Sequence, residues 1–175
     1  MRYARVEREA RVVVSRAPDP ATAVRSRDIE DRYLRGTRMR LRRVSEHGMP
    51  DVLKLGHKVR FDESDPSRLA HTTFYLDPEE YVLLAGLQAD MVTKTRSTYR
   101  LGDGNSLAVD TFHDVLVGLV LAEVELADDA TEAPDVLRDM GVDVTNDERF
   151  TGAALARTDS HSLRILLATT VGVGH

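Results

Sequence analysis

Apolar and polar residues alternate along several short stretches of this chain, a pattern typical of β-strands with one buried face. The stretch 6–14, VEREARVVV, is the first of them. Because successive side chains of a strand point to opposite faces, Glu7, Glu9 and Arg11 would share one face, opposite the apolar residues. The same alternation predicts strands at residues 29–34, 38–42, 52–60, 71–76, 93–101, 107–112, 120–126 and 142–145.

Capping and turn residues mark where helices begin and where strands reverse. Asp77-Pro78-Glu79-Glu80 offers an N-cap, a proline at the first helical position and an acid three residues after the cap, so a helix is expected over 78–87. Gly102-Asp103-Gly104-Asn105 predicts a hairpin turn. Further helical segments are expected at 21–27, at 133–140 with Gly141 as its stop, at 149–156 and at 162–170.

The polar faces of at least five predicted strands consist almost entirely of Glu, Arg and Lys. A solvated antiparallel sheet would explain such a face in any single strand. Solvated faces usually also contain Thr, Ser and Gln, so the repeated rows favour a sheet closed into a barrel with its charged faces inward. Such a barrel would concentrate these charges around a polyanion and its metal ions.

Composition narrows the chemistry further. The 175 residues include no cysteine, which excludes disulfides and thiolate metal sites and fits a reducing cytoplasm, the expected location. The first 50 residues carry 13 Arg against 7 Asp and Glu, although the whole chain has a net charge of −5. Aromatic residues make up only 5%, with no Trp, so base stacking is scarce and no nucleic-acid partner is expected. The longest apolar run, 115–122, is too short to cross a bilayer, so no membrane association is expected.

Short motifs follow one another in order along these strands. Glu7-Arg8-Glu9-Ala10-Arg11 has the form ExExK with arginine at its last position, and Ile29, Tyr33 and Leu34 fit I-x-Q-x-Y-L. The later motifs are Arg38-Met39-Arg40-Leu41 (R-V-R-I), Leu55-Gly56-His57-Lys58 (L-T-x-K), Lys94-Thr95-Arg96 (K-x-R), Val109-Asp110-Thr111-Phe112 (V-D-x-F), 118–126 (G-L-x-x-A-E-x-E-L) and 144–156 (V-T-x-D-x-R-Y).

With these motifs the chain resembles the CYTH domains, also called triphosphate tunnel metalloenzymes, from residue 6 to about 156. The resemblance implies an α+β fold: an eight-stranded antiparallel β-barrel that forms a tunnel, with flanking helices, in a single domain over 1–175. Family members hydrolyse or cyclise triphosphate compounds with Mg²⁺ or Mn²⁺. The expected partner is therefore a small molecule that contains a triphosphate, and a homodimer is left open.

The resemblance and the chemistry of phosphoryl transfer assign roles to the charged residues. Phosphate oxygens need fixed cations, so the expected substrate-binding residues are Arg38, Arg40, Lys58, Lys94 and Arg96. Magnesium and manganese prefer carboxylate oxygens, so the expected metal ligands are Glu7, Glu9, Glu123, Glu125 and Asp110. Within the first motif, Glu7, Glu9 and Arg11 are expected to form the catalytic group.

Some positions depart from the family pattern and leave alternatives open. Arg11 replaces a lysine and cannot lose its proton. Arg68-Leu69-Ala70-His71-Thr72 lacks the acids of the family's R-x-E-x-E strand. We therefore expect a metal-dependent hydrolase of inorganic triphosphate or an organic triphosphate, with a weakly active or inactive polyphosphate- or nucleotide-binding module as the alternative. Adenylyl cyclase activity is a third hypothesis, supported by the resemblance alone.

Overall fold

A computed structural model describes residues 5–60, 68–102, 104–126 and 134–172, with the side chains of 8–59, 70–102, 104–126 and 134–172. The strands are β1 (Arg5–Val14), β2 (Arg25–Leu34), β3 (Met39–Ser45), β4 (Val52–Arg60), β5 (Arg68–Tyr75), β6 (Ala89–Arg100), β7 (Ser106–Phe112), β8 (Val120–Glu125) and β9 (Gly141–Asp143). The α-helices are α1 (Pro78–Ala85), α2 (Asp135–Arg138), α3 (Gly152–Leu155) and α4 (Ser160–Val171), and short 3-10 turns are η1 (Pro20–Thr22), η2 (Asp114–Leu116) and η3 (Glu148–Phe150).

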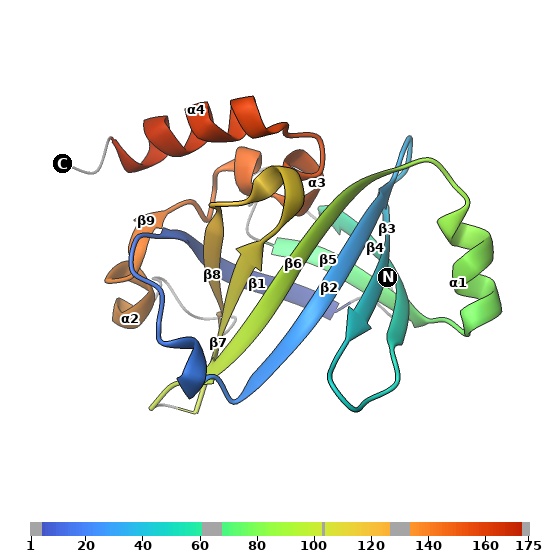
Figure 1. Cartoon of the computed structure of the whole chain (residues 1–175), viewed down its shortest axis with the longest axis horizontal. Helices are drawn as coiled ribbons and strands as arrows, with labels where there is room; N and C mark the ends of the chain where they lie inside the picture. The colour runs from blue at the N-terminus through green and yellow to red at the C-terminus, as the bar shows by residue number, and fades with distance from the viewer. Residues whose placement is uncertain (1–4, 61–67, 103, 127–133, 173–175) are drawn as a thin grey trace.

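All nine strands belong to one antiparallel sheet, so the predicted α+β class is confirmed. The strand order is β5-β4-β3-β2-β6-β7-β8-β1-β9. The first residues of β1 also pair with β5, from Arg5↔His71 to Arg8↔Arg68. The sheet therefore curves so that its edge strand β5 touches the start of β1, and β4 and β5 lie behind β2 and β6 in Figure 1.

The expected eight-stranded closed barrel needs correction in two respects. The sheet has nine strands, and it is not closed into a barrel, because β5 meets β1 over only four residue pairs. Further along, Val12–Val14 of β1 pair with β9 instead, so this part of the β1 edge is not available to β5. The seam is consequently short, and Phe74 and Tyr75 at the far end of β5 are 57% and 72% exposed.

Two predicted helix boundaries were also wrong. No helix spans 21–27, because β2 already begins at Arg25, where a ten-residue pairing with β6 starts. The helix expected at 133–140 ends earlier, at Arg138, and Gly141, its predicted stop, is the first residue of β9. A Cβ there would lie 1.9 Å from the Val13 carbonyl oxygen, so the close pairing of β9 with β1 requires glycine. The predicted capping box of α1 is confirmed, since Asp77 and Glu80 bond reciprocally to each other's backbone N–H.

Apolar residues cover both sides of the sheet in different places. On the outer face, Val12, Val109 and Val124 pack with Leu137 of α2 and Met140. On the inner face, a second cluster lies at the end of the sheet nearest α3 and α4 (Figure 1). It joins Val13, Val92, Phe112 and Leu121 to Phe150, Leu155, Leu163 and Leu166. The C-terminal segments thus fill one end of the inner face with apolar side chains and leave the rest to polar residues.

Candidate functional site

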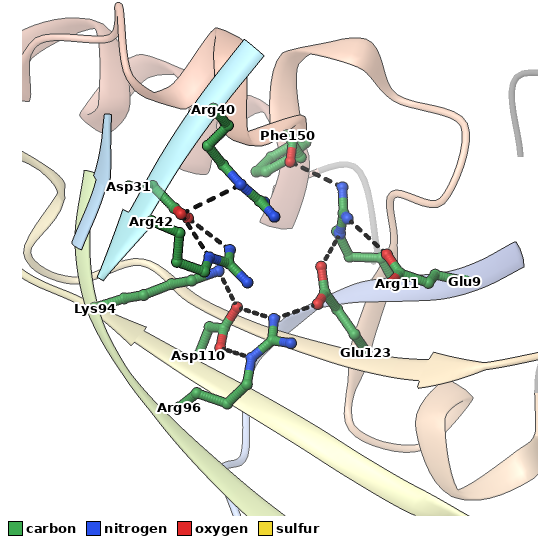
Figure 2. A network of polar contacts seen from close by, with 10 residues as sticks. All are labelled: Glu9, Arg11, Asp31, Arg40, Arg42, Lys94, Arg96, Asp110, Glu123 and Phe150. Carbon is green, nitrogen blue, oxygen red and sulfur yellow. Dashed lines mark hydrogen bonds and ion pairs between the residues drawn. The ribbon is translucent and has the colours of Figure 1, made fainter. Parts of the chain in front are cut away.

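Charged side chains from six strands converge on the inner face of the sheet, next to the apolar cluster (Figure 2). We call this set the charged network. It contains five cations and four carboxylates, and the carbonyl of Phe150 completes it. Its members are Glu9, Arg11, Asp31, Arg40, Arg42, Lys94, Arg96, Asp110, Glu123 and Phe150.

Strand register explains why these residues meet. Directly opposite residues in antiparallel strands place their side chains on the same face, about 5 Å apart. Three such opposite pairs lie in the charged network, each a cation facing an acid. They are Asp31↔Arg42 between β2 and β3, Arg96↔Asp110 between β6 and β7, and Arg11↔Glu123 between β1 and β8.

Asp31 is the centre of one half of the charged network. It is 1% exposed, and its two carboxylate oxygens accept hydrogen bonds from Arg42 Nε and Nη2 at 2.6 and 2.7 Å. Arg40 Nε lies 3.4 Å from Asp31 Oδ1 and is buried without a hydrogen-bond partner among the described residues. Burial alone would raise the pKa of Asp31, but Arg40 and Arg42 hold it well below its usual value. Asp31 is therefore ionised and fixes two guanidinium groups.

Asp110 and Glu123 organise the other half. Arg96 donates from Nε to Asp110 Oδ1 and from Nη2 to Glu123 Oε2, both at 2.6 Å. Lys94 is 8% exposed and donates to Asp110 Oδ2, with its ammonium 5.3 Å from the centre of the Phe112 ring. Burial opposes ionisation of both carboxyls, but the adjacent cations lower the pKa of Asp110 and lower that of Glu123 further.

Arg11 connects this half to the C-terminal segment and to Glu9. Its Nε donates to Glu123 Oε1 at 2.6 Å and its Nη1 to the Phe150 carbonyl at 3.0 Å, while Nη2 lies 3.5 Å from Glu9 Oε2 (Figure 2). Repulsion from Glu123, followed by burial, raises the pKa of Glu9. Two neighbouring carboxylates whose charges repel each other form a place where an additional cation would be stabilised.

The structure brings together most of the predicted site residues. Seven of them lie in the charged network: Glu9, Arg11, Arg40, Lys94, Arg96, Asp110 and Glu123. Lys58 lies close enough for its charge to lower the pKa of Glu9. Arg38 and Glu125 are exposed and lie outside the network, and the side chain of Glu7 falls outside the described part of the chain.

Sequence reasoning missed Asp31 and did not assign Arg42 to the site. The sequence pattern around each of these two residues could have indicated its place in the site. Asp31 stands at the glutamine position of I-x-Q-x-Y-L, and Arg42 continues the alternation of Arg38 and Arg40. The ion pair between them could be found only from the pairing of β2 with β3.

A metal centre is not preformed among the described side chains, where no group of three or more His, Asp or Glu residues could hold an ion. The oxygens of Asp110 and Glu123 already accept hydrogen bonds from Lys94, Arg96 and Arg11. Glu9, with a side chain 34% exposed, is the carboxylate of the network most open to a ligand.

Comparison with solved structures finds proteins of similar fold. The structure of the inorganic triphosphatase NE1496 is 25% identical with a TM-score of 0.57, over 87% of this chain and 95% of that one. A structure of the hypothetical protein NE1496 is 26% identical, with the same TM-score, over 87% and 99% of the two chains. The PH1819 protein from Pyrococcus horikoshii OT3, at 20% identity and a TM-score of 0.52 over 76% and 85%, shares the fold.

No family model and no curated protein matches the chain. The similarity to an inorganic triphosphatase agrees with the fold expected from the CYTH motifs. Among the described residues, no helix has the length and apolar character needed to cross a membrane.

Proposed function

We propose that this chain is a single CYTH-like domain that hydrolyses triphosphate compounds with the help of a divalent metal ion. The observation that carries the proposal is the charged network, in which five cations share one face of the sheet with four carboxylates. With Lys58, whose charge acts on Glu9, six cations are available to a ligand on this face. An excess of fixed positive charge within a curved sheet is suited to a polyanion.

The cations are proposed to bind and orient the phosphate chain. Arg40, Arg42 and Arg96 have side chains 16–20% exposed, so each guanidinium can reach a ligand while a carboxylate holds its orientation. Arginine binds phosphate oxygens in a bidentate manner. Lys94 lies deeper, and Lys58 approaches from the side of Glu9. Arg38, which is exposed, would contact only the outer part of the ligand.

The acids fit a divalent cation that is shared with the substrate. Magnesium is usually held by one or two carboxylates together with phosphate oxygens, so a complete protein cage is not needed. We assign Glu9 and Glu123 as its main ligands because the ion would relieve their repulsion. Glu7, Glu125 and Asp110 are further proposed ligands. When bound, Mg²⁺ or Mn²⁺ would supply additional positive charge to the phosphoryl oxygens.

The reaction consists of attack by a water oxygen on a phosphorus atom and cleavage of the anhydride P–O bond. Negative charge grows on the leaving oxygen, and Lys94, Arg40 and Arg96 would stabilise it. Arg11 stays protonated, so its catalytic contribution is electrostatic. Its bonds to Glu123 and Phe150 hold the guanidinium in place before substrate arrives. Glu7 and Glu9 complete the proposed catalytic group.

Phosphate release from triphosphate, pyrophosphate, ATP and thiamine triphosphate, with Mg²⁺ or Mn²⁺, tests the proposal. We expect turnover of at least one triphosphate and its loss in Glu9→Gln. This variant removes a carboxylate that Glu123 repels, so the fold should survive. Glu46→Gln is the matched control, because Glu46 pairs with Arg25 outside the charged network. Equal turnover in Glu9→Gln and the wild type would contradict the assignment of Glu9.

A binding module without turnover is the second candidate, supported by the hydrogen bonds that already occupy Asp110 and Glu123. Under this alternative, triphosphate raises the melting temperature but no phosphate is released with any divalent metal. If triphosphate neither stabilises the protein nor is hydrolysed, both candidates are wrong.

A further inference from the structure

Arg27 is a cation on the inner face that neither the motifs nor the charged network includes. It lies on β2 four residues before Asp31, and therefore on the same side of the strand. Within the described part of the chain its guanidinium has no hydrogen bond or ion pair, and its Nε is buried without a partner. An unsatisfied buried donor is costly, which makes this side chain unusual.

The surroundings of Arg27 are mainly positive. Its direct neighbour on β6 is Arg96, and like charges in opposite positions destabilise a sheet. Burial, followed by the charges of Arg25, Arg96 and Arg42, lowers the pKa of its guanidinium. Glu46 is the only acid among these influences, and both of its oxygens already accept hydrogen bonds from Arg25.

Arg27 also marks a boundary along β2. Before it, the side chain of Arg25 is 50% exposed, and after it Ile29 and Asp31 are buried. At the end of the sheet near α3 and α4, the apolar cluster that contains Phe150 and Leu155 fills the inner face. β2 begins at the opposite end of the sheet (Figure 1). The apolar cluster blocks extension of a ligand toward α3 and α4, and the opposite direction along β2 leads from the charged network to Arg27.

Arg42 and Arg96 have hydrogen-bonding capacity that the described carboxylates do not use. Each uses Nε and Nη2 to bind carboxylates, and the Nη1 group of each has no hydrogen bond to a described residue. Two guanidinium groups fixed by carboxylates and a third without a partner can together surround a tetrahedral anion.

We infer that Arg27, Arg42 and Arg96 form an outer anion subsite that receives a phosphoryl group beyond those bound by Arg40 and Lys94. The inference rests on the proposed function and extends it. The preferred ligand is a linear phosphate chain with at least three phosphoryl groups, and pyrophosphate is expected to leave this subsite empty. In the ligand-free protein the three arginines repel each other, and the ligand relieves this repulsion.

Two measurements on Arg27→Gln test the inference: Kd for pyrophosphate, triphosphate and tetraphosphate by calorimetry, and the melting temperature without ligand. We expect the Kd for triphosphate and tetraphosphate to rise at least tenfold, consistent with loss of a charge-assisted hydrogen bond, and that for pyrophosphate less than twofold. The melting temperature of the ligand-free variant should rise, because repulsion and an unsatisfied donor are removed. Arg43→Gln, which alters the same net charge through an exposed residue paired with Glu30, should change neither quantity.

The outcomes separate this inference from the proposed function. If Arg40→Gln weakens triphosphate binding but Arg27→Gln does not, the outer subsite is wrong and the proposed function stands. Equal weakening of pyrophosphate and triphosphate binding in Arg27→Gln, or a lower melting temperature without ligand, would also overturn the subsite. If the wild type binds none of the three phosphates, the proposed function fails and the subsite with it.

Discussion

Replacing Asp31 by asparagine should destabilise the protein, because it removes the negative charge that two arginines share. Asp31 is 1% exposed and makes two hydrogen bonds to Arg42 at 2.6 and 2.7 Å. Arg40 lies 3.4 Å away. In Asp31→Asn both guanidinium groups keep their charge, and no described carboxylate replaces the missing one.

The size of the effect follows from burial. Removing one partner of a buried ion pair costs about 3–5 kcal/mol. The side chains of Arg40 and Arg42 are 17% and 16% exposed, and asparagine keeps one acceptor oxygen for Arg42. We therefore expect Asp31→Asn to lower the free energy of unfolding by about 2–3 kcal/mol, at or below the lower end of that range. For a chain of this length, this corresponds to a decrease of roughly 5–10 °C in melting temperature.

The same substitution has a defined pH dependence. The folded protein holds the pKa of Asp31 below the ordinary value of 3.8, against the effect of burial, because of Arg40 and Arg42. A lowered pKa contributes stability that is present above the unfolded value and disappears as the pH falls toward the folded value. The difference between wild type and Asp31→Asn should thus be constant from about pH 5 to 8 and shrink below about pH 4.

Urea unfolding of both proteins at pH 7, 5 and 3 measures this difference. Asp90→Asn is the control, since Asp90 binds Arg35 and Arg157, whose side chains are 61% and 65% exposed. We expect a much smaller change there, because water screens exposed pairs. Equal stability of Asp31→Asn and wild type at pH 7, or a difference that stays unchanged at pH 3, would refute the reasoning.

Three further substitutions test other parts of the fold. In Gly152→Ala the new Cβ would lie 1.9 Å from the Tyr33 hydroxyl, so either the Tyr33 side chain or α3 must shift, and calorimetry should show a lower melting temperature, whereas no change would mean that Tyr33 is not packed there. Asp77→Ala removes the N-cap of α1, and chemical denaturation should show a loss of about 1 kcal/mol; an unchanged midpoint would argue against the capping box. Gly141→Ala should weaken the pairing of β9 with β1, seen as faster amide hydrogen exchange at β9, and unchanged exchange would contradict the close approach to Val13.

Sequence reasoning located most of the strands because the alternation of apolar and charged residues has a period of two. It also grouped Arg40, Lys94, Arg96 and Glu123 on polar faces, which the structure brings together. It failed for the segment 21–27, where local composition favoured a helix but pairing of β2 with β6 determines the conformation. Local patterns carry no information about such distant partners.

The sequence by itself determined which residues alternate, which positions cap α1 and which charges are available for a polyanion. Only the tertiary structure decided how these charges pair. Strand register places Arg42 opposite Asp31 and Arg96 opposite Asp110, so that carboxylates fix the cations that the motifs suggested. It also leaves Arg27 opposite Arg96 and, among the described residues, without a carboxylate of its own. The physical reason is that electrostatic interactions depend on distance across strands that are far apart in the chain, and a single sequence does not specify those distances.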